Sequence, residues 1–281
     1  MRLIDSHAHL QSDRFDGDRE AVLERARSAG VERLLVPGWD EPSSEAALEL
    51  VARWPWLDAA AGIHPHDAER SDAAAWESIS HLARDARVVA IGETGLDYDR
   101  LFSPVAVQRA NLRRHLELGL ELGKPVILHC RSAVGDTRAH DDLLELLEAA
   151  GIRAGAVAAG TSRVASGAPA RPAAVIHSFS GSAAFADEVL GRGLAISISG
   201  LAFRTGEAAT LEHVAAAIPS RRLLVETDSP FLSPPGAPRR RNEPEWVRVT
   251  AERVAQARET APEAFGDELV AAYDATFGRV S

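Results

Sequence analysis

Residues 104–131, which read PVAVQRANLRRHLELGLELGKPVILHCR, contain a helix-then-strand pattern that is repeated along this chain. The stretch 104–122 has a proline in its first turn and is followed by Gly123, as expected for a helix. The run at 125–128 is apolar throughout, which is typical of a parallel strand buried on both faces. The segment therefore predicts a helix that leads into a buried strand, and polar side chains begin where that strand ends.

The same alternation of short apolar runs and longer helical stretches continues along the chain. Strands are expected at residues 2–5, 33–37, 57–63, 88–92, 125–128, 174–176, 194–197 and 223–226. Helices are expected at residues 19–29, 43–53, 73–84, 104–122, 141–150, 183–190, 206–217, 243–258 and 262–277. Eight strand–helix alternations in 281 residues predict an α/β fold, a (β/α)8 TIM barrel, organised as one domain over residues 1–281.

Two stretches do not follow this alternation. Residues 152–173 are rich in Ala, Gly, Ser and Pro and have weak periodicity, which predicts an extended loop before the sixth strand. Residues 232–242 are rich in Pro and Arg and follow the eighth strand, where we expect a second loop.

The overall charge and hydropathy limit the classes of function. The net charge of −10 argues against a protein that coats nucleic acid generally, although an enzyme can handle phosphates through a metal and a few arginines. No apolar run approaches the roughly 20 residues that cross a bilayer, and residues 1–7 lack the apolar stretch of a signal peptide. Cys130 is the only cysteine, so no intramolecular disulfide can form. We therefore expect a cytoplasmic monomer without a membrane partner.

Residues that can ligate a metal follow five of the apolar runs. They are His7 and His9 after the first strand, Glu93 after the fourth, His129 after the fifth, His177 after the sixth and Asp228 after the eighth. In a parallel barrel these positions open onto one mouth, where barrel enzymes carry out their chemistry. Imidazole and carboxylate groups both bind divalent cations. The alternative is a set of scattered, hydrogen-bonded polar residues, but burying so many ionisable groups without an ion would be costly.

The histidines divide by position along the chain. Of the ten, six lie at or just past strand ends, namely His7, His9, His64, His66, His129 and His177. The other four, His81, His115, His140 and His213, fall in helical or loop stretches, and we expect them to be ordinary surface residues. This division favours the interpretation as a metal site.

Seven short motifs give the chain a resemblance to the TatD family of metal-dependent deoxyribonucleases, within the amidohydrolase-like barrels. They are DSHAH at 5–9, GIHPH at 62–66, GETGLD at 92–97, LHCR at 128–131, HSFSG at 177–181, ETDSP at 226–230 and RNEP at 241–244. The motifs occur in the family's order and cover almost the whole chain. The long loop at 152–173 departs from the family pattern and leaves the range of substrates open.

The resemblance assigns roles to the candidate residues. It implies that His7, His9 and Asp228 hold one divalent ion, that His129 and His177 hold a second, and that Glu93 bridges both. The two ions would be Zn²⁺, Mg²⁺ or Mn²⁺. The resemblance also places His64 near the substrate phosphate.

The expected chemistry is hydrolysis by a metal-activated water. Two ions a few ångströms apart can polarise a phosphoryl oxygen and lower the pKa of a bound water from about 15.7 toward 7. Glu93 can join the ions, and Asp228 can take the proton of the water as the catalytic base or serve as a ligand alone. DNA or another phosphodiester is the expected substrate, cleaved by a 3'-5' exonuclease-like activity.

Several assignments have open alternatives. His64, His66 and Arg131 are candidates for substrate contacts, but the histidines can equally orient metal ligands and Arg131 can form a structural salt bridge. Arg241 and Asn242 are expected to order the last loop, and residues 239–241 to meet a nucleic-acid backbone or to be solvated surface. The same centre could hydrolyse amides or esters, as in a D-aminoacyl-tRNA deacylase. A catalytically silent metal-binding scaffold is the alternative from another class.

Overall fold

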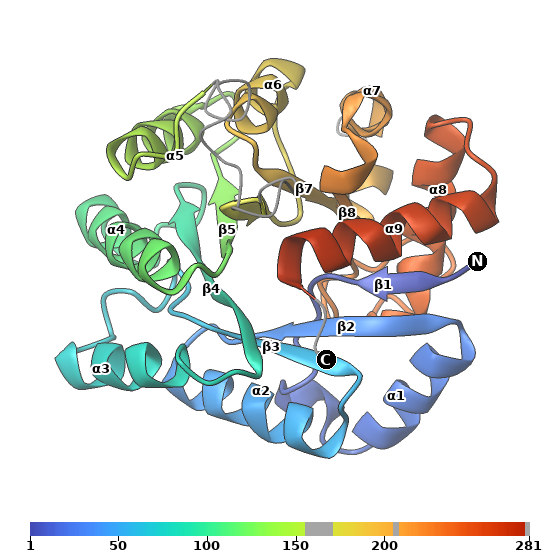
Figure 1. Ribbon diagram of the computed structural model, residues 1–281, viewed down its shortest axis with the longest axis horizontal. Coiled ribbons are helices and arrows are strands. Elements are labelled where there is room, and N and C mark those ends of the chain that lie inside the picture. Colours follow the sequence, from blue (N-terminus) through green and yellow to red (C-terminus); the bar gives the residue numbers. More distant parts are fainter. Residues whose placement is uncertain (155–170, 205–207, 279–281) are drawn as a thin grey trace, which may run out of the picture.

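The computed structural model has a ring of parallel strands at its centre and helices around the outside (Figure 1). The structure describes residues 1–154, 171–204 and 208–278. The strands pair side by side in chain order, and every pair is parallel. They are β1 (Leu3–Asp5), β2 (Val31–Pro37), β3 (Leu57–Ala61), β4 (Val88–Asp97), β5 (Val126–Arg131), β6 (Ala174–Ile176), β7 (Ala195–Ile198) and β8 (Leu223–Val225). The predicted (β/α)8 barrel is confirmed.

The helices begin and end at the signals that the sequence contains. At the start of α2, the Asp40 side chain accepts a hydrogen bond from Ser43 N, and the Ser43 side chain accepts one from Asp40 N. The end of α4 is followed by Gly123 in the left-handed region, at φ 63°. The helices are α1 (Arg19–Ser28), α2 (Glu41–Arg53), α3 (Ala73–Leu82), α4 (Val105–Leu122), α5 (Arg138–Ala149), α6 (Ala183–Gly191), α7 (Ala208–Ala217), α8 (Val247–Ala257) and α9 (Pro262–Phe277). Short 3-10 turns occur at η1 (Asp13–Phe15), η2 (Gly200–Phe203), η3 (Ser220–Arg222) and η4 (Pro244–Trp246).

Backbone and side-chain bonds between the first and last strands close the barrel. Ser6 N donates to Val225 O at 3.0 Å, and a parallel bridge joins Ala8 to Ser229. The fully buried Asp5 carboxylate accepts from Thr227 N at 3.0 Å and from Thr227 Oγ1 at 2.6 Å. Burial raises the pKa of Asp5 to about 8, against the effect of the Thr227 hydrogen bonds. The segments that follow β1 and β8 are thereby held next to each other.

The opposite end of the barrel is filled by α9. The Tyr273 side chain is fully buried, and its hydroxyl donates to Asp58 Oδ2 at 2.7 Å, near the start of β3. Arg33, near the start of β2, pairs with the same carboxylate. This end is therefore packed with side chains, and the carboxyl ends of the strands provide the accessible mouth.

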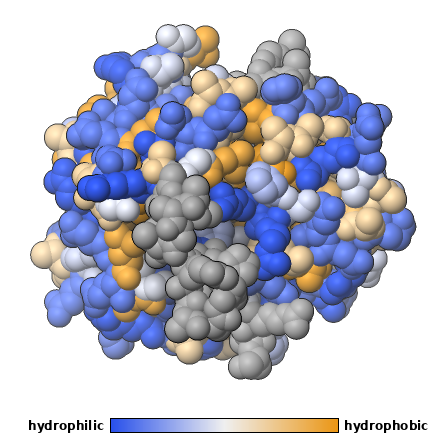
Figure 2. Space-filling model, turned by 45° about the horizontal axis from the view of Figure 1, so that its top comes forward, coloured by the Kyte–Doolittle hydropathy of each residue, from blue (hydrophilic) through white to orange (hydrophobic). Residues whose placement is uncertain are grey.

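The hydropathy of the surface and of the helices is consistent with the absence of long apolar runs in the sequence. Figure 2 shows mainly hydrophilic residues on the face that it draws, with hydrophobic ones between them. Within the described residues, no helix is both long enough and apolar enough to pass through a membrane.

One predicted boundary is wrong in a way that matters for the site. Glu93 was expected to follow β4, but β4 continues to Asp97 and Glu93 lies inside it. The pairing of β4 with β5 is irregular between Ile91 and Thr94, and Glu93 N donates instead to Gly38 O at 2.7 Å. This break in the ladder lets a residue inside a strand present a carboxylate at the mouth.

The two predicted loops have different outcomes. Residues 232–242 contain no helix or strand, as expected. Of the predicted loop at 152–173, residues 155–170 lie outside the part of the chain that the structure describes, and the described residues at its two ends are neither helix nor strand.

Candidate metal centre

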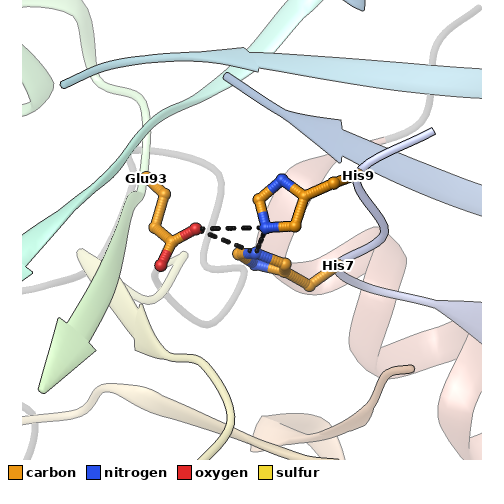
Figure 3. A group of neighbouring side chains, drawn as sticks. All are labelled: His7, His9 and Glu93. Atoms are coloured by element: carbon orange, nitrogen blue, oxygen red, sulfur yellow. Dashed lines mark hydrogen bonds and ion pairs between the residues drawn. The ribbon is translucent and has the colours of Figure 1, made fainter. Parts of the chain in front are cut away.

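Side chains from opposite sides of the barrel meet at its mouth, and Figure 3 shows His7, His9 and Glu93 pointing toward one another. Glu93 Oε2 lies 3.1 Å from His7 Nε2 and 3.5 Å from His9 Nε2, and the two nitrogens are 3.2 Å apart. Asp228 Oδ1 lies 3.4 Å from His9 Nε2 and 3.8 Å from His7 Nε2. We call His7, His9, Asp228 and the Oε2 atom of Glu93 the first group.

A second set of donors gathers around the other oxygen of the same carboxylate. Glu93 Oε1 lies 2.9 Å from His177 Nε2, 3.1 Å from His129 Nδ1 and 3.1 Å from His64 Nε2. The nitrogens of His129 and His177 are 3.2 Å apart. We call His64, His129, His177 and the Oε1 atom of Glu93 the second group. Glu93 is therefore shared, with one oxygen in each group.

The spacing of these atoms fits bound divalent cations. A tetrahedral ion with ligands about 2.1 Å away separates neighbouring ligand atoms by about 3.4 Å. The observed separations within the two groups run from 2.9 to 3.8 Å. In the described chain, three sets of His and carboxylate residues have ligand atoms that all lie within 4.8 Å of one another, and two of these sets contain Glu93. The residues present therefore fit a metal on each side of Glu93.

The buried carboxylates are held in their charged form. Burial alone would raise the pKa of Glu93, but the imidazole of His177, whose own pKa is raised, keeps it well below its usual range. Burial also opposes ionisation of Asp228, whose pKa is lowered by His9 and His7. Two anions in a buried place need positive charge nearby, which a divalent ion supplies.

His64 carries no charge at neutral pH. Burial lowers the pKa of its imidazole to about 4, although Glu93 acts in the opposite direction. A neutral imidazole can ligate a metal or donate one hydrogen bond. The structure places this residue beside Glu93 in the second group, and its predicted contact with a substrate phosphate stays a prediction.

Two carboxylates lie behind histidines of the second group. Glu226 Oε1 lies 3.2 Å from His177 Nδ1, and Asp97 Oδ2 lies 3.4 Å from His129 Nε2 and 2.7 Å from His66 Nε2. A carboxylate in this position orients a metal-binding imidazole and fixes its tautomer. The sequence analysis assigned no role to Asp97 or Glu226. The available signal was their presence in the GETGLD and ETDSP motifs, within four residues of Glu93 and Asp228.

Asp97 also ties the histidines to the loop that follows β4. Its Oδ1 atom accepts from Asp99 N at 3.1 Å and from Arg100 N at 2.9 Å. Burial would raise the pKa of Asp97, but His129 and His66 hold it well below the usual range. The anion is therefore kept at neutral pH, and it links one predicted metal ligand to the rim of the mouth.

The arginines predicted at the rim are engaged within the protein. Arg131 Nε donates to Asp99 Oδ2 at 2.8 Å, so the salt-bridge alternative is present. Arg241 donates to both oxygens of Asp18, at 2.6 and 2.7 Å, and to Glu243 Oε1 at 2.7 Å. These bonds order the loop that follows β8, and a phosphate contact of Arg131 stays a prediction.

The prediction for His115 is wrong. Its side chain is fully buried rather than at the surface. Nε2 accepts from Ile63 N at 3.0 Å, and Nδ1 lies 2.7 Å from Asn111 O. Burial lowers the pKa of His115 to about 3, so the ring is neutral. It supports the backbone just before His64, whereas His81 and His213 are exposed as expected and His140 is partly buried.

Glycines and one strained residue shape the mouth. Gly95, at φ +140°, lies so close to β5 that a Cβ atom would be 1.9 Å from His129 O, and a Cβ atom at Gly62 would be 2.4 Å from Gly92 Cα. Asp228 adopts a left-handed backbone conformation, at φ 53°, and its N–H donates to His7 O at 2.9 Å. Strain of this kind is common at functional sites, and here it turns the carboxylate toward His9.

A closed parallel barrel with nitrogen and oxygen donors around a shared carboxylate at its mouth is the architecture of a metal-dependent hydrolase. Comparison with known proteins agrees with this class. The family model described as TatD related DNase matches residues 4–278, so the chain belongs to that family. It is a hydrolase that uses divalent metal.

Named relatives and a solved structure resemble the chain over most of its length. The 3'-5' ssDNA/RNA exonuclease TatD of Klebsiella pneumoniae (strain 342) is 37% identical over 249 residues, which cover 87% of this chain and 86% of that protein. The uncharacterized metal-dependent hydrolase YabD of Bacillus subtilis (strain 168) is 35% identical over 260 residues, 92% of this chain and 91% of that protein. The crystal structure of YJJV, a TatD homolog from Escherichia coli k12, has a TM-score of 0.82 at 29% identity and covers 99% of this chain and 98% of that one.

Proposed function

We propose that this chain is a 3'-5' exonuclease that removes nucleotides from single-stranded DNA or RNA with two divalent ions. The observation that carries the proposal is the division of Glu93, whose two oxygens face two separate groups of donors. A paired centre of this kind serves in-line displacement at phosphorus. The relatives named as ssDNA/RNA exonucleases, at 34–37% identity, support the substrate.

The first group would hold one ion, and His129 and His177 of the second group would hold the other, with Glu93 between them. Bound there, the ions would polarise a phosphoryl oxygen and lower the pKa of a water molecule. The histidines provide most of the donors, and imidazole suits Zn²⁺ better than Mg²⁺ or Mn²⁺. We therefore expect purified protein to retain Zn²⁺ through dialysis.

The side chains of this protein would divide the remaining work. Asp228, kept ionised beside His9, accepts the proton of the attacking water at the carboxylate oxygen that does not face His9. His64, which is neutral, donates a hydrogen bond to a non-bridging oxygen of the phosphate. Asp97 and Glu226 hold His129 and His177 in place, so that their other nitrogens stay directed toward Glu93.

End-labelled oligonucleotides test the proposal. With added Mn²⁺, Mg²⁺ or Zn²⁺, we expect stepwise shortening from the 3' end of a single strand, and no shortening after chelation. The variant Asp228→Asn should lose this activity, and Asp187→Asn, an exposed acid on α6, should keep it. Cleavage of a D-aminoacyl ester without DNA cleavage would favour an ester or amide hydrolase. Failure on both, with the same stability after chelation, would favour a silent scaffold.

A further inference from the structure

Most of the exposed large hydrophobic side chains of the described chain lie in loops at the barrel mouth. The exposed side chains are Leu101 (50% exposed), Phe102 (62%), Leu120 (49%), Val134 (105%) and Phe231 (51%). Four of these five lie in loops that follow β4, β5 or β8, and Leu120 lies on α4, away from the mouth. Single exposed hydrophobic residues are common, but a concentration around one site indicates ligand binding.

Phe231 borders the first group. Its ring centroid lies 6.1 Å from that of His9, with the ring planes at 72°. Its N–H donates to Asp228 O at 2.8 Å, so the backbone position of the ring is set by a predicted metal ligand. The Arg14 guanidinium lies 5.7 Å from the ring centroid and donates to Pro230 O at 3.4 Å. The ring is anchored and half exposed, with a positive charge beside it.

Phe102 borders the second group in a similar way. Its ring stands edge-on to His66, at 4.7 Å between centroids and 86° between planes. The next residue, Ser103, is fully buried, and its hydroxyl donates to His66 O at 3.1 Å and accepts from Glu69 N at 3.1 Å. Gln108 Nε2 donates to Ser103 O at 2.7 Å. These hydrogen bonds fix the loop on the barrel, so the exposed ring of Phe102 is held in a defined position.

The two rings lie near histidines that face different oxygens of the shared carboxylate. His9, beside Phe231, faces Glu93 Oε2 at 3.5 Å. His66, beside Phe102, has its ring 4.3 Å from that of His64, which faces Glu93 Oε1 at 3.1 Å. A chain of nucleotides with one phosphodiester over Glu93 would therefore bring a base toward each ring.

We propose that Phe102 and Phe231 are stacking platforms, each for one base of a single-stranded nucleic acid, on the two sides of the bond that is cleaved. This inference rests on the proposed function and names how the site selects its substrate. Every base has a face that can stack on an aromatic ring, so the platforms tolerate any sequence. In a duplex the bases are already stacked and paired, which leaves their faces unavailable. The protein thus selects single strands by the availability of base faces.

Kinetic measurements on matched variants and substrates test the platforms. The variants are Phe102→Ala and Phe231→Ala, with Leu120→Ala as an exposed hydrophobic control. The substrates are a single-stranded oligonucleotide and the same strand with its last two bases replaced by abasic sites. We expect each Phe variant to raise KM for the normal strand about tenfold with little change in kcat, and to leave the abasic strand unaffected. Phe→Tyr at either position should restore most of the binding, and Leu120→Ala should behave as wild type.

Binding without turnover gives a second readout. In chelator, fluorescence anisotropy of a labelled strand should show the same loss of affinity for both Phe variants, and the loss should be absent for the abasic strand. If wild-type protein binds and cleaves the normal and abasic strands equally, the proposal that Phe102 and Phe231 stack bases is wrong, while the proposed nuclease activity is supported. Equal losses on both strands would likewise contradict stacking. If wild-type protein cleaves neither strand with any metal, both the proposed nuclease activity and the proposed base stacking are wrong.

Discussion

The two groups that share Glu93 place their negative charge differently. In the first group the carboxylate of Asp228 faces the histidine nitrogens directly, 3.4 Å from His9 Nε2. Behind the rings of His7 and His9, the Nδ1 atoms are buried and have no hydrogen-bond partner within the described part of the chain. In the first group, the charge of a bound ion would therefore be balanced by a carboxylate in direct contact with it.

The second group consists of imidazoles apart from the shared carboxylate, and its own acids lie one side chain further back. Glu226 lies 3.2 Å from His177 Nδ1, and Asp97 lies 3.4 Å from His129 Nε2, an ion-pair distance at which that nitrogen has no hydrogen-bond partner in the described chain. Burial would lower the pKa of His177, but Glu93 and Glu226 hold it well above its usual range. A carboxylate in this position makes the imidazole a stronger base and fixes its orientation. The two groups therefore reach similar negative charge by different arrangements, in direct contact in the first and behind the histidines in the second.

The largest effect is expected from Glu93→Gln, because this residue belongs to both groups. We expect activity to fall on the order of 10⁴-fold, since both ions lose a shared ligand. Elemental analysis after dialysis should show that metal is lost from both positions. Glu121→Gln, on the exposed surface of α4, is the matched control. Retention of one full equivalent at unchanged affinity would mean that Glu93 serves one group alone.

The next largest effect is expected from Asp228→Asn, which removes the direct charge of the first group. Activity should fall about 10²- to 10³-fold, because the amide neither accepts the proton nor neutralises the ion. Calorimetric titration with Zn²⁺ should then show one strong site in place of two. Loss of both sites would contradict the independence of the groups.

A smaller and selective effect is expected from Glu226→Gln and from Asp97→Asn. Each should weaken binding of the second ion about 10- to 100-fold and leave the first unchanged. Titration of Co²⁺, followed by its visible absorption, separates the two sites. If either variant weakened the first ion as strongly as the second, the acids would act on the barrel mouth as a whole.

Sequence patterns predicted the gathering of the donors because strand ends in a parallel barrel share one mouth. His7, His9, His129, His177 and Asp228 followed from that rule alone. Glu93 was correctly predicted to lie at this mouth, but not as a residue that follows β4. It lies inside β4 and reaches the site where the pairing of β4 with β5 is interrupted. No periodic pattern contains that break.

Residues that orient the predicted metal ligands were harder to identify from the sequence. Asp97 and Glu226 have roles that depend on distances between residues far apart in the chain, which one sequence cannot show. His115 was misplaced although a signal existed. It shares a helix face with Asn111, Leu112 and Leu118, all of them buried, so the spacing alone placed it inside.

Removing the metal is also expected to lower the stability of the folded protein. Each ion stabilises the folded state by about 2.7 kcal/mol when present at 100 times its Kd. Chelation should therefore lower the Tm of the wild-type protein by about 5–10 °C for each ion lost. The Tm of the Glu93→Gln variant should change little on chelation, because this variant is expected to have lost its metal already. An unchanged Tm on chelation of the wild type would mean that neither group holds an ion tightly.

The adjacency of β1 and β8 has a consequence for synthesis of the protein. The first group takes His7 and His9 from the beginning of the chain and Asp228 from near its end, and the Asp5–Thr227 bonds join these segments. A nascent chain on the ribosome cannot assemble this group until its last strand has emerged. Fragments that end before residue 228 lack Asp228 and cannot complete the first group.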